Sequence, residues 1–164
     1  MRRVAALALL LAGCGASEDA PAPVTTATTN PLERAAVAAG MVPDPSADPT
    51  GLYAREEDRM CVVPAETGWR VGVVTALVDE PGCTAAGTLQ RRGDRLAIDL
   101  GDGCAFDARF EGDRIVFPAE VPDACAKSCK GRASLSALDV PMLSDAPAEA
   151  AALRDRRGRP LCAP

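Results

Sequence analysis

The stretch CAFDARF, residues 104–110, alternates between two kinds of side chain. One phase is apolar and comprises Cys104, Phe106, Ala108 and Phe110. The other phase carries the charged pair Asp107 and Arg109. Successive side chains of a β-strand point to opposite faces of its sheet, so this alternation predicts a strand with one buried face and one solvated face.

Segments on both sides of this stretch have the same character. We expect further strands within residues 60–64, 70–78, 83–90, 95–100, 114–117 and 132–143. Turn residues separate them at 79–82, 91–94, 101–103 and 111–113. Short alternating runs between frequent turns are typical of antiparallel sheets with one buried face. The fold class expected is mainly β: a small antiparallel meander or partly closed barrel.

Two helices are predicted outside the sheet. Asn30 is a suitable N-cap for a short helix that begins at Pro31 and ends near Gly40. A C-terminal helix is expected from about Pro147 to Arg157, capped by Ser144 or Asp145 and followed by Gly158. The stretch MVPDPSADPT between residues 41 and 50 is rich in Pro and Asp, which predicts a linker.

The first residues have the composition of an export signal. Met1-Arg2-Arg3 is positively charged, and the eight residues that follow are apolar, far fewer than the ~20 that a membrane-spanning helix needs. Leu11-Ala12-Gly13-Cys14 resembles the lipobox of bacterial lipoproteins. The resemblance implies cleavage before Cys14, acylation of Cys14 and, with Gly15 next instead of Asp, an outer-membrane location facing the periplasm. The alternative is an ordinary secretory signal with Cys14 as a spare thiol.

These features divide the chain into three parts. Residues 1–13 are expected to be a signal peptide, and residues 14–50 the lipidated cysteine, a tether and the short helix. Residues 51–164 are expected to form a β-rich domain. Aromatic side chains are few and much of the apolar content is alanine, so disulfides would compensate for a light core.

The seven cysteines divide into Cys14 and an even set of six. In an exported chain the six predict three disulfides, formed by Cys61, Cys83, Cys104, Cys125, Cys129 and Cys162. The pairing expected is Cys61 with Cys162, Cys83 with Cys104, and Cys125 with Cys129. A metal site is the competing interpretation. The sequence has no histidine and only one close cysteine pair, so no metal ligand set and no cofactor are expected.

Catalytic groups are scarce. There is no histidine to act as a base, and oxidised cysteines cannot act as nucleophiles. Acidic residues occur at predicted turns and on polar strand phases: Asp99, Asp102, Asp107, Glu111 and Asp113. Asp is common at such positions, so no catalytic residue is assigned, although an enzyme that uses only carboxylates stays open as an alternative.

Charge limits the classes of partner. The net charge is −5, and removal of residues 1–13 leaves 16 basic against 23 acidic residues. Nucleic-acid binding is not expected, because it requires clustered basic residues. The predicted function is that of a membrane-anchored envelope lipoprotein, attached through the lipid on Cys14. Its non-catalytic β-domain would bind an envelope protein or a small ligand, or serve a structural role.

Two arginine-rich stretches admit a structural and a functional interpretation. Arg91 and Arg92, with Arg95, are interpreted as balancing neighbouring acids in a hairpin turn. Arg154-Asp155-Arg156-Arg157 is expected to be the solvated end of a helix. Alternatively, its arginines meet an anionic partner such as peptidoglycan carboxylates or lipid phosphates.

A small, acidic, disulfide-bonded β-barrel on a lipid anchor also resembles the membrane-bound lysozyme inhibitors of Gram-negative bacteria. The resemblance implies binding of a cationic enzyme as an alternative function. The Ser-Gly-x-x-Tyr signature of those inhibitors is absent. Thr50-Gly51-Leu52-Tyr53 is one residue shorter than that signature.

Overall fold

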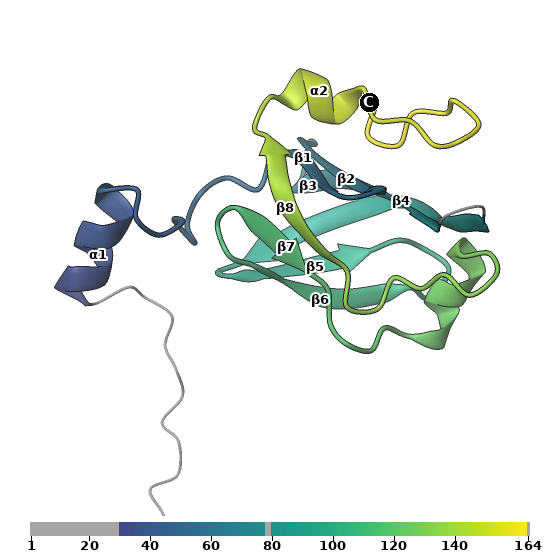
Figure 1. Cartoon of the computed structure of the whole chain (residues 1–164), viewed down its shortest axis with the longest axis horizontal. Coiled ribbons are helices and arrows are strands. Elements are labelled where there is room, and N and C mark those ends of the chain that lie inside the picture. The colour runs from purple at the N-terminus through teal and green to yellow at the C-terminus, as the bar shows by residue number, and fades with distance from the viewer. Residues whose placement is uncertain (1–29, 78–79, 164) are drawn as a thin grey trace, which may run out of the picture.

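A computed structural model describes residues 30–77 and 80–163 of the chain. Eight antiparallel strands form a closed barrel, in which each strand pairs with the next in sequence and the first pairs with the last (Figure 1). The strands are β1 (Gly51–Arg55), β2 (Asp58–Pro64), β3 (Trp69–Leu77), β4 (Glu80–Arg92), β5 (Arg95–Asp99), β6 (Ala105–Phe110), β7 (Arg114–Val116) and β8 (Asp139–Ser144). The predicted mainly β class is confirmed, and the barrel is fully closed.

The stretch that predicted the sheet lies in β6. Ala108 and Phe110 are buried, whereas Asp107 and Arg109 are exposed. Ala108 pairs with Leu96 of β5, so the apolar phases of these neighbouring strands share the inner face. The alternation of residues 104–110 therefore describes the strand correctly.

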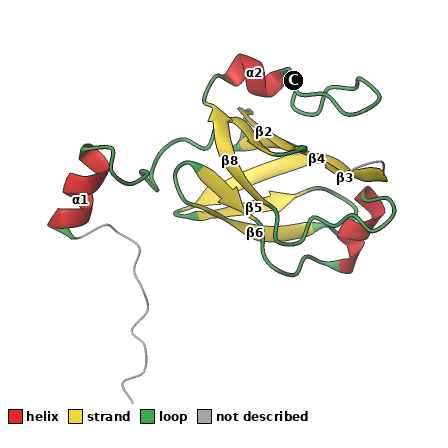
Figure 2. Cartoon of the chain, viewed as in Figure 1, coloured by secondary structure: helices red, strands yellow, loops and turns green. Residues whose placement is uncertain are grey.

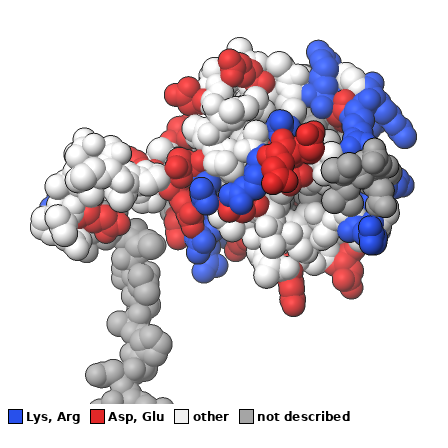
Figure 3. Space-filling view, viewed as in Figure 1, with Lys and Arg blue, Asp and Glu red and all other residues white. Residues whose placement is uncertain are grey.

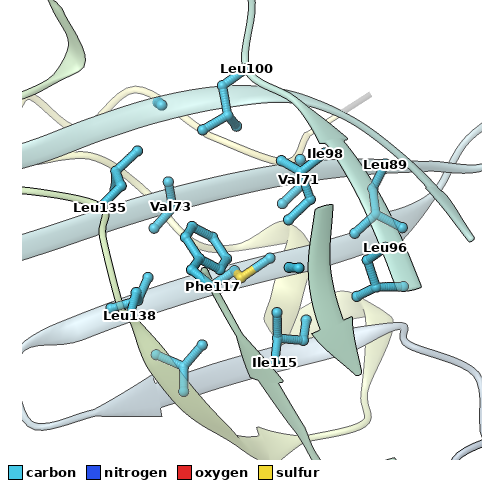
Figure 4. Packing of buried hydrophobic residues seen from close by; sticks show 14 of the residues in the cluster. Val71, Val73, Leu89, Leu96, Ile98, Leu100, Ile115, Phe117, Leu135 and Leu138 are labelled. Carbon is cyan, nitrogen blue, oxygen red and sulfur yellow. The ribbon is translucent and has the colours of Figure 1, made fainter. Parts of the chain in front are cut away.

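Apolar side chains from the surrounding strands meet in the barrel interior (Figure 4). The largest fully buried side chains are Tyr53, Phe110, Met60, Leu89, Leu96, Ile98, Ile115, Leu135, Val62, Val71, Val73 and Val140. A second, smaller cluster lies outside β2 and β3 and comprises Cys61, Val63, Val74, Ala150, Leu161 and Cys162. The run Met60–Val63 is buried without alternation because the C-terminal segment covers the outer face of β2.

The short N-terminal helix is confirmed. Helix α1 (Pro31–Ala38) begins after Asn30, whose Oδ1 accepts a hydrogen bond from the Leu32 amide at 3.0 Å. Gly40 has φ 67°, a conformation that commonly ends a helix. None of the residues of α1 is buried, and the helix stands beside the barrel (Figure 2).

Helix α2 (Pro147–Ala151) is much shorter than the predicted 147–157. The chain turns back after Ala152 because residues 153–161 form a hairpin of their own. Arg154 forms an isolated β-bridge with Pro160, and the Leu161 amide donates to the Leu153 carbonyl at 3.0 Å. Gly158, at φ 76°, provides the tight turn that a continuing helix would not contain.

Three other features differ from the sequence prediction. In the stretch 132–143 the strand begins only at Asp139, because the residues before it belong to the crossing segment 117–138. Strand β1 was not predicted, since Gly51–Arg55 offers only Leu52 and Tyr53 as large apolar side chains. Residues 80–82 of the turn expected at 79–82 belong to a strand instead, because β4 begins at Glu80 and includes Gly82. A Cβ at Gly82 would collide with the main chain of Thr75, where the β3–β4 register shifts. Glycine there permits a close strand approach instead of making a turn.

Three disulfides staple the barrel, and one of the three predicted pairings is correct. Cys61 pairs with Cys162, whereas the other bonds join Cys83 to Cys129 and Cys104 to Cys125. The predicted Cys83–Cys104 and Cys125–Cys129 pairs are therefore wrong. Residues 117–138 cross one end of the barrel and contain the 3-10 helix η1 (Asp123–Ser128). This crossing brings Cys125 to the β5–β6 connection and Cys129 to the start of β4.

Candidate binding surface

The barrel centre is occupied by side chains. Tyr53 and Met60 are 0% exposed and Phe110 is 1% exposed. An eight-stranded barrel is just wide enough either to be filled by side chains or to hold one small ligand. In this barrel the side chains fill the interior, so a ligand has to be sought on the outer surface.

A groove of ≈ 760 Å³ lies on that outer surface, between the β2–β3 connection and α2. Its lining residues are Val63, Pro64, Ala65, Glu66, Thr67, Arg70, Thr88, Pro147, Ala148, Ala151 and Cys162. The walls are more apolar than polar, Glu66 and Arg70 add opposite charges, and the groove is open to solvent. The Arg70 guanidinium donates to the Ala163 carbonyl, which ties the C-terminal segment to β3. The sequence did not reveal this groove, because segments far apart in the chain build it.

A second, smaller hollow of ≈ 390 Å³ lies over β5, β6 and β7. It includes the exposed pair Arg95 and Asp107, whose charged atoms are 3.8 Å apart. An exposed ion pair at this separation contributes little to stability, at most ~1 kcal/mol.

The acidic residues considered for carboxylate chemistry are not brought into one cleft. Asp99 Oδ1 accepts the Gly101 amide at 2.9 Å, which is ordinary turn chemistry, and Asp102 follows in the same loop. Glu111 and Asp113 lie at the other end of the barrel, because β6 runs between the two loops. Among residues 30–77 and 80–163, no group of three or more His, Cys, Asp or Glu side chains is arranged to hold a metal ion.

Residues 44–50, part of the stretch 41–50 predicted to be a linker, close the barrel end nearer to α1. The Arg91 guanidinium donates to the Ser46 carbonyl at 3.3 Å and to the carbonyls of Pro45 and Ala47. It also lies 5.1 Å from the centre of the Phe110 ring, within reach of a cation–π contact. Arg91 therefore binds main-chain oxygens and an aromatic ring, which corrects its interpretation as mainly a balance for acids.

Two further hydrogen bonds hold residues 49 and 50 against the same end of the barrel. The Tyr53 hydroxyl donates to the Pro49 carbonyl at 2.6 Å, and the Trp69 indole donates to Thr50 Oγ1 at 3.1 Å. Burial raises the pKa of Tyr53, so its hydroxyl stays protonated as a donor. Burial also favours the neutral form of Asp48, but hydrogen bonds from Thr50 outweigh it and lower the pKa of that carboxyl. Tyr53, the last residue of the stretch Thr50–Tyr53, is fully buried.

The arginine-rich run 154–157 lies in the hairpin after α2 and not at a helix end. Asp155 Oδ1 accepts the amides of Arg157 and Arg159, each at 2.8 Å. Its Oδ2 accepts the Arg159 Nε at 2.7 Å. Burial opposes ionisation of Asp155, yet these hydrogen bonds and the Arg159 charge lower its pKa. A buried carboxylate thus organises the turn while the arginines around it are exposed.

Figure 3 shows how charge is distributed on one face of the molecule. Basic side chains gather at the upper right, where Figure 1 places the C-terminal segment. Acidic side chains gather near α2 and near the junction with α1. The hairpin is therefore a basic feature on a chain whose net charge is −5.

Comparisons with family models, with curated proteins and with solved structures find no match. Cys14 and the predicted signal peptide lie outside the described residues. Within the described ranges, no helix has both the length and the apolar character required to span a bilayer.

Proposed function

We propose that this protein is a lipid-anchored component of the bacterial envelope, acylated at Cys14 and sorted to the outer membrane, where it faces the periplasm. Its barrel is a non-catalytic binding module that works through the outer surface. No enzymatic step is assigned to it.

The main support for an envelope location comes from the disulfides. The six downstream cysteines pair among themselves, and five of them are at most 1% exposed. Such bonds form and persist in oxidising compartments, which supports export. They also leave Cys14 outside the disulfide set, directly after an apolar segment that resembles a lipoprotein signal.

The packing of the barrel supports the second half of the proposal. Side chains fill the interior, and the acids considered for catalysis are spread over the two ends of the barrel and the outer face of β6. Binding is therefore assigned to the exterior, which offers the groove beside α2 and the charged C-terminal hairpin.

Acylation is tested by growing a Gram-negative host that expresses the full-length chain with an alkyne-bearing fatty acid. The wild-type protein should take up the label and sediment with membranes. Cys14→Ser should lose the label, because serine cannot form the thioether to the lipid. Ser17→Ala, three residues further on, is the matched control and should label normally.

Sorting is tested in the same cells with Gly15→Asp, which should move the labelled protein to the inner-membrane fraction. Undiminished labelling of Cys14→Ser would refute the anchor. A protein recovered from the cytosol with residues 1–13 still attached would refute export altogether.

A further inference from the structure

We propose that the C-terminal hairpin, residues 153–161, is a binding site for an anionic polymer whose carboxylates are held by Arg154, Arg156 and Arg157. This inference rests on the proposed function in one respect: the envelope location determines where the protein would meet such a polymer.

The base of the hairpin is fixed to the barrel. Leu161 is 8% exposed and packs in the outer apolar cluster, and Cys162 is bonded to Cys61 of β2. The Arg154–Pro160 bridge joins the two arms. The hairpin is thus held at a defined place on the surface.

The tip of the hairpin is fixed by Asp155. This side chain receives three hydrogen bonds from Arg157 and Arg159, and the Arg154 guanidinium donates to the Gly158 carbonyl at 3.0 Å. Because the turn is already ordered, the main chain loses little conformational entropy when a ligand binds, and the cost is limited to the arginine side chains.

The charge of the hairpin is strongly positive. Residues 153–161 contain four arginines and one aspartate, and Asp155 is paired with Arg159. The Arg156 and Arg157 side chains are exposed and form no ion pair with any residue that the structure describes. Their guanidinium groups are thus available to carboxylates, which they can bind through two parallel hydrogen bonds.

The surroundings favour a thin polymer over a membrane surface. The exposed acids Asp145 and Glu149 lie at α2, immediately before the hairpin, and Figure 3 shows acidic side chains near that helix. A flat anionic bilayer would meet these acids together with the arginines. A single polymer strand can contact the hairpin alone, so repulsion from the remaining acidic surface would direct it there.

Peptidoglycan, which carries carboxylates on its peptides, is the probe for this test. The full chain, purified in uncharged detergent, is sedimented with insoluble peptidoglycan sacculi over a range of protein concentrations. Arg154→Ser/Arg156→Ser/Arg157→Ser should weaken binding about tenfold, as expected for the loss of three exposed ion pairs. The matched control Arg34→Ser/Arg92→Ser/Arg95→Ser changes the net charge equally and should bind within about twofold of wild type.

The variant Asp155→Ala distinguishes binding by an ordered hairpin from non-specific attraction between positive charge and an anionic polymer. It makes the protein more positive but removes the acceptor that orders the turn, so binding to sacculi should fall about threefold or more. Tighter or unchanged binding by Asp155→Ala overturns the proposal, as does equal loss in the two triple variants. A parallel sedimentation uses vesicles of anionic phospholipid, and binding to these vesicles but not to sacculi also overturns it. Labelling at Cys14 is measured independently, so a failure of this inference is distinguishable from a failure of the proposed function.

Discussion

Arg91 joins the segment before the barrel to the barrel itself. Its guanidinium reaches carbonyls of residues 45–47 from one side and lies over Phe110 on the other. Hydrogen bonds that involve a charged group contribute about 1.5–3 kcal/mol, more than bonds between neutral groups. One side chain on β4 therefore holds a segment that has no regular secondary structure of its own.

Arg91→Ala should lower the free energy of unfolding by about 1–3 kcal/mol and expose residues 45–47 to solvent. Hydrogen exchange of the segment and denaturation in guanidinium chloride measure the two effects. The neighbouring Arg92→Ala is the control and should change stability by no more than about 0.5 kcal/mol, because Arg92 is exposed. Unchanged exchange in Arg91→Ala would contradict this role.

At the scale of elements, the disulfides differ in the length of chain they close. Cys61–Cys162 spans 101 residues and Cys104–Cys125 spans 21. The first connects the C-terminal segment to β2, whereas the second connects η1 to the β5–β6 loop. A longer closed loop removes more conformational entropy from the unfolded chain.

Cys61→Ala/Cys162→Ala should therefore destabilise the protein more than Cys104→Ala/Cys125→Ala. The loop-closure relation gives a difference of about 1.4 kcal/mol between the two double variants. Denaturation of each, with intact mass confirming that the other two bonds remain, makes the comparison. An equal or reversed order would mean that strain or residual structure in the unfolded state dominates.

Sequence alone predicted elements whose pattern is local. Strands β5 and β6 alternate clearly because one face is buried and the other solvated. The α1 start followed from Asn30 and Pro31, but the 147–157 helix was wrong because cationic residues before a glycine resemble a helix end. The disulfide pairing depends on how residues 117–138 cross the barrel, and no local pattern contains that information.

The candidate surface was predictable to a smaller extent. The arginine run was visible in sequence, but its place on a hairpin was not. The groove beside α2 and the role of Arg91 arise from contacts between segments distant in the chain. Only the three-dimensional arrangement identifies them.

At the scale of the whole molecule, the filled interior determines stability and leaves the outer surface of the barrel as the part that a ligand could contact. Leu89 is 0% exposed, and its neighbours in the cluster leave it no contact with solvent. Close packing makes the removal of a buried side chain costly, since the surroundings relax only partly. The barrel thus serves as a rigid support for features on its exterior.

Leu89→Ala should lower the free energy of unfolding by about 2–5 kcal/mol. Leu143→Ala removes the same atoms from a side chain that is 64% exposed and should cost less than about 0.5 kcal/mol. Thermal and chemical denaturation measure both. Similar losses in the two variants would show that the interior is loosely packed and could admit a ligand.

The pairing of β1 with β8 has a consequence for synthesis and assembly. A chain that stops before Asp139 lacks β8, so β1 and β7 would be unpaired edge strands. Each could pair with a strand from another molecule. The barrel thus closes only after β8 has been synthesised. Until then the newly synthesised protein depends on rapid export or on a chaperone to avoid aggregation.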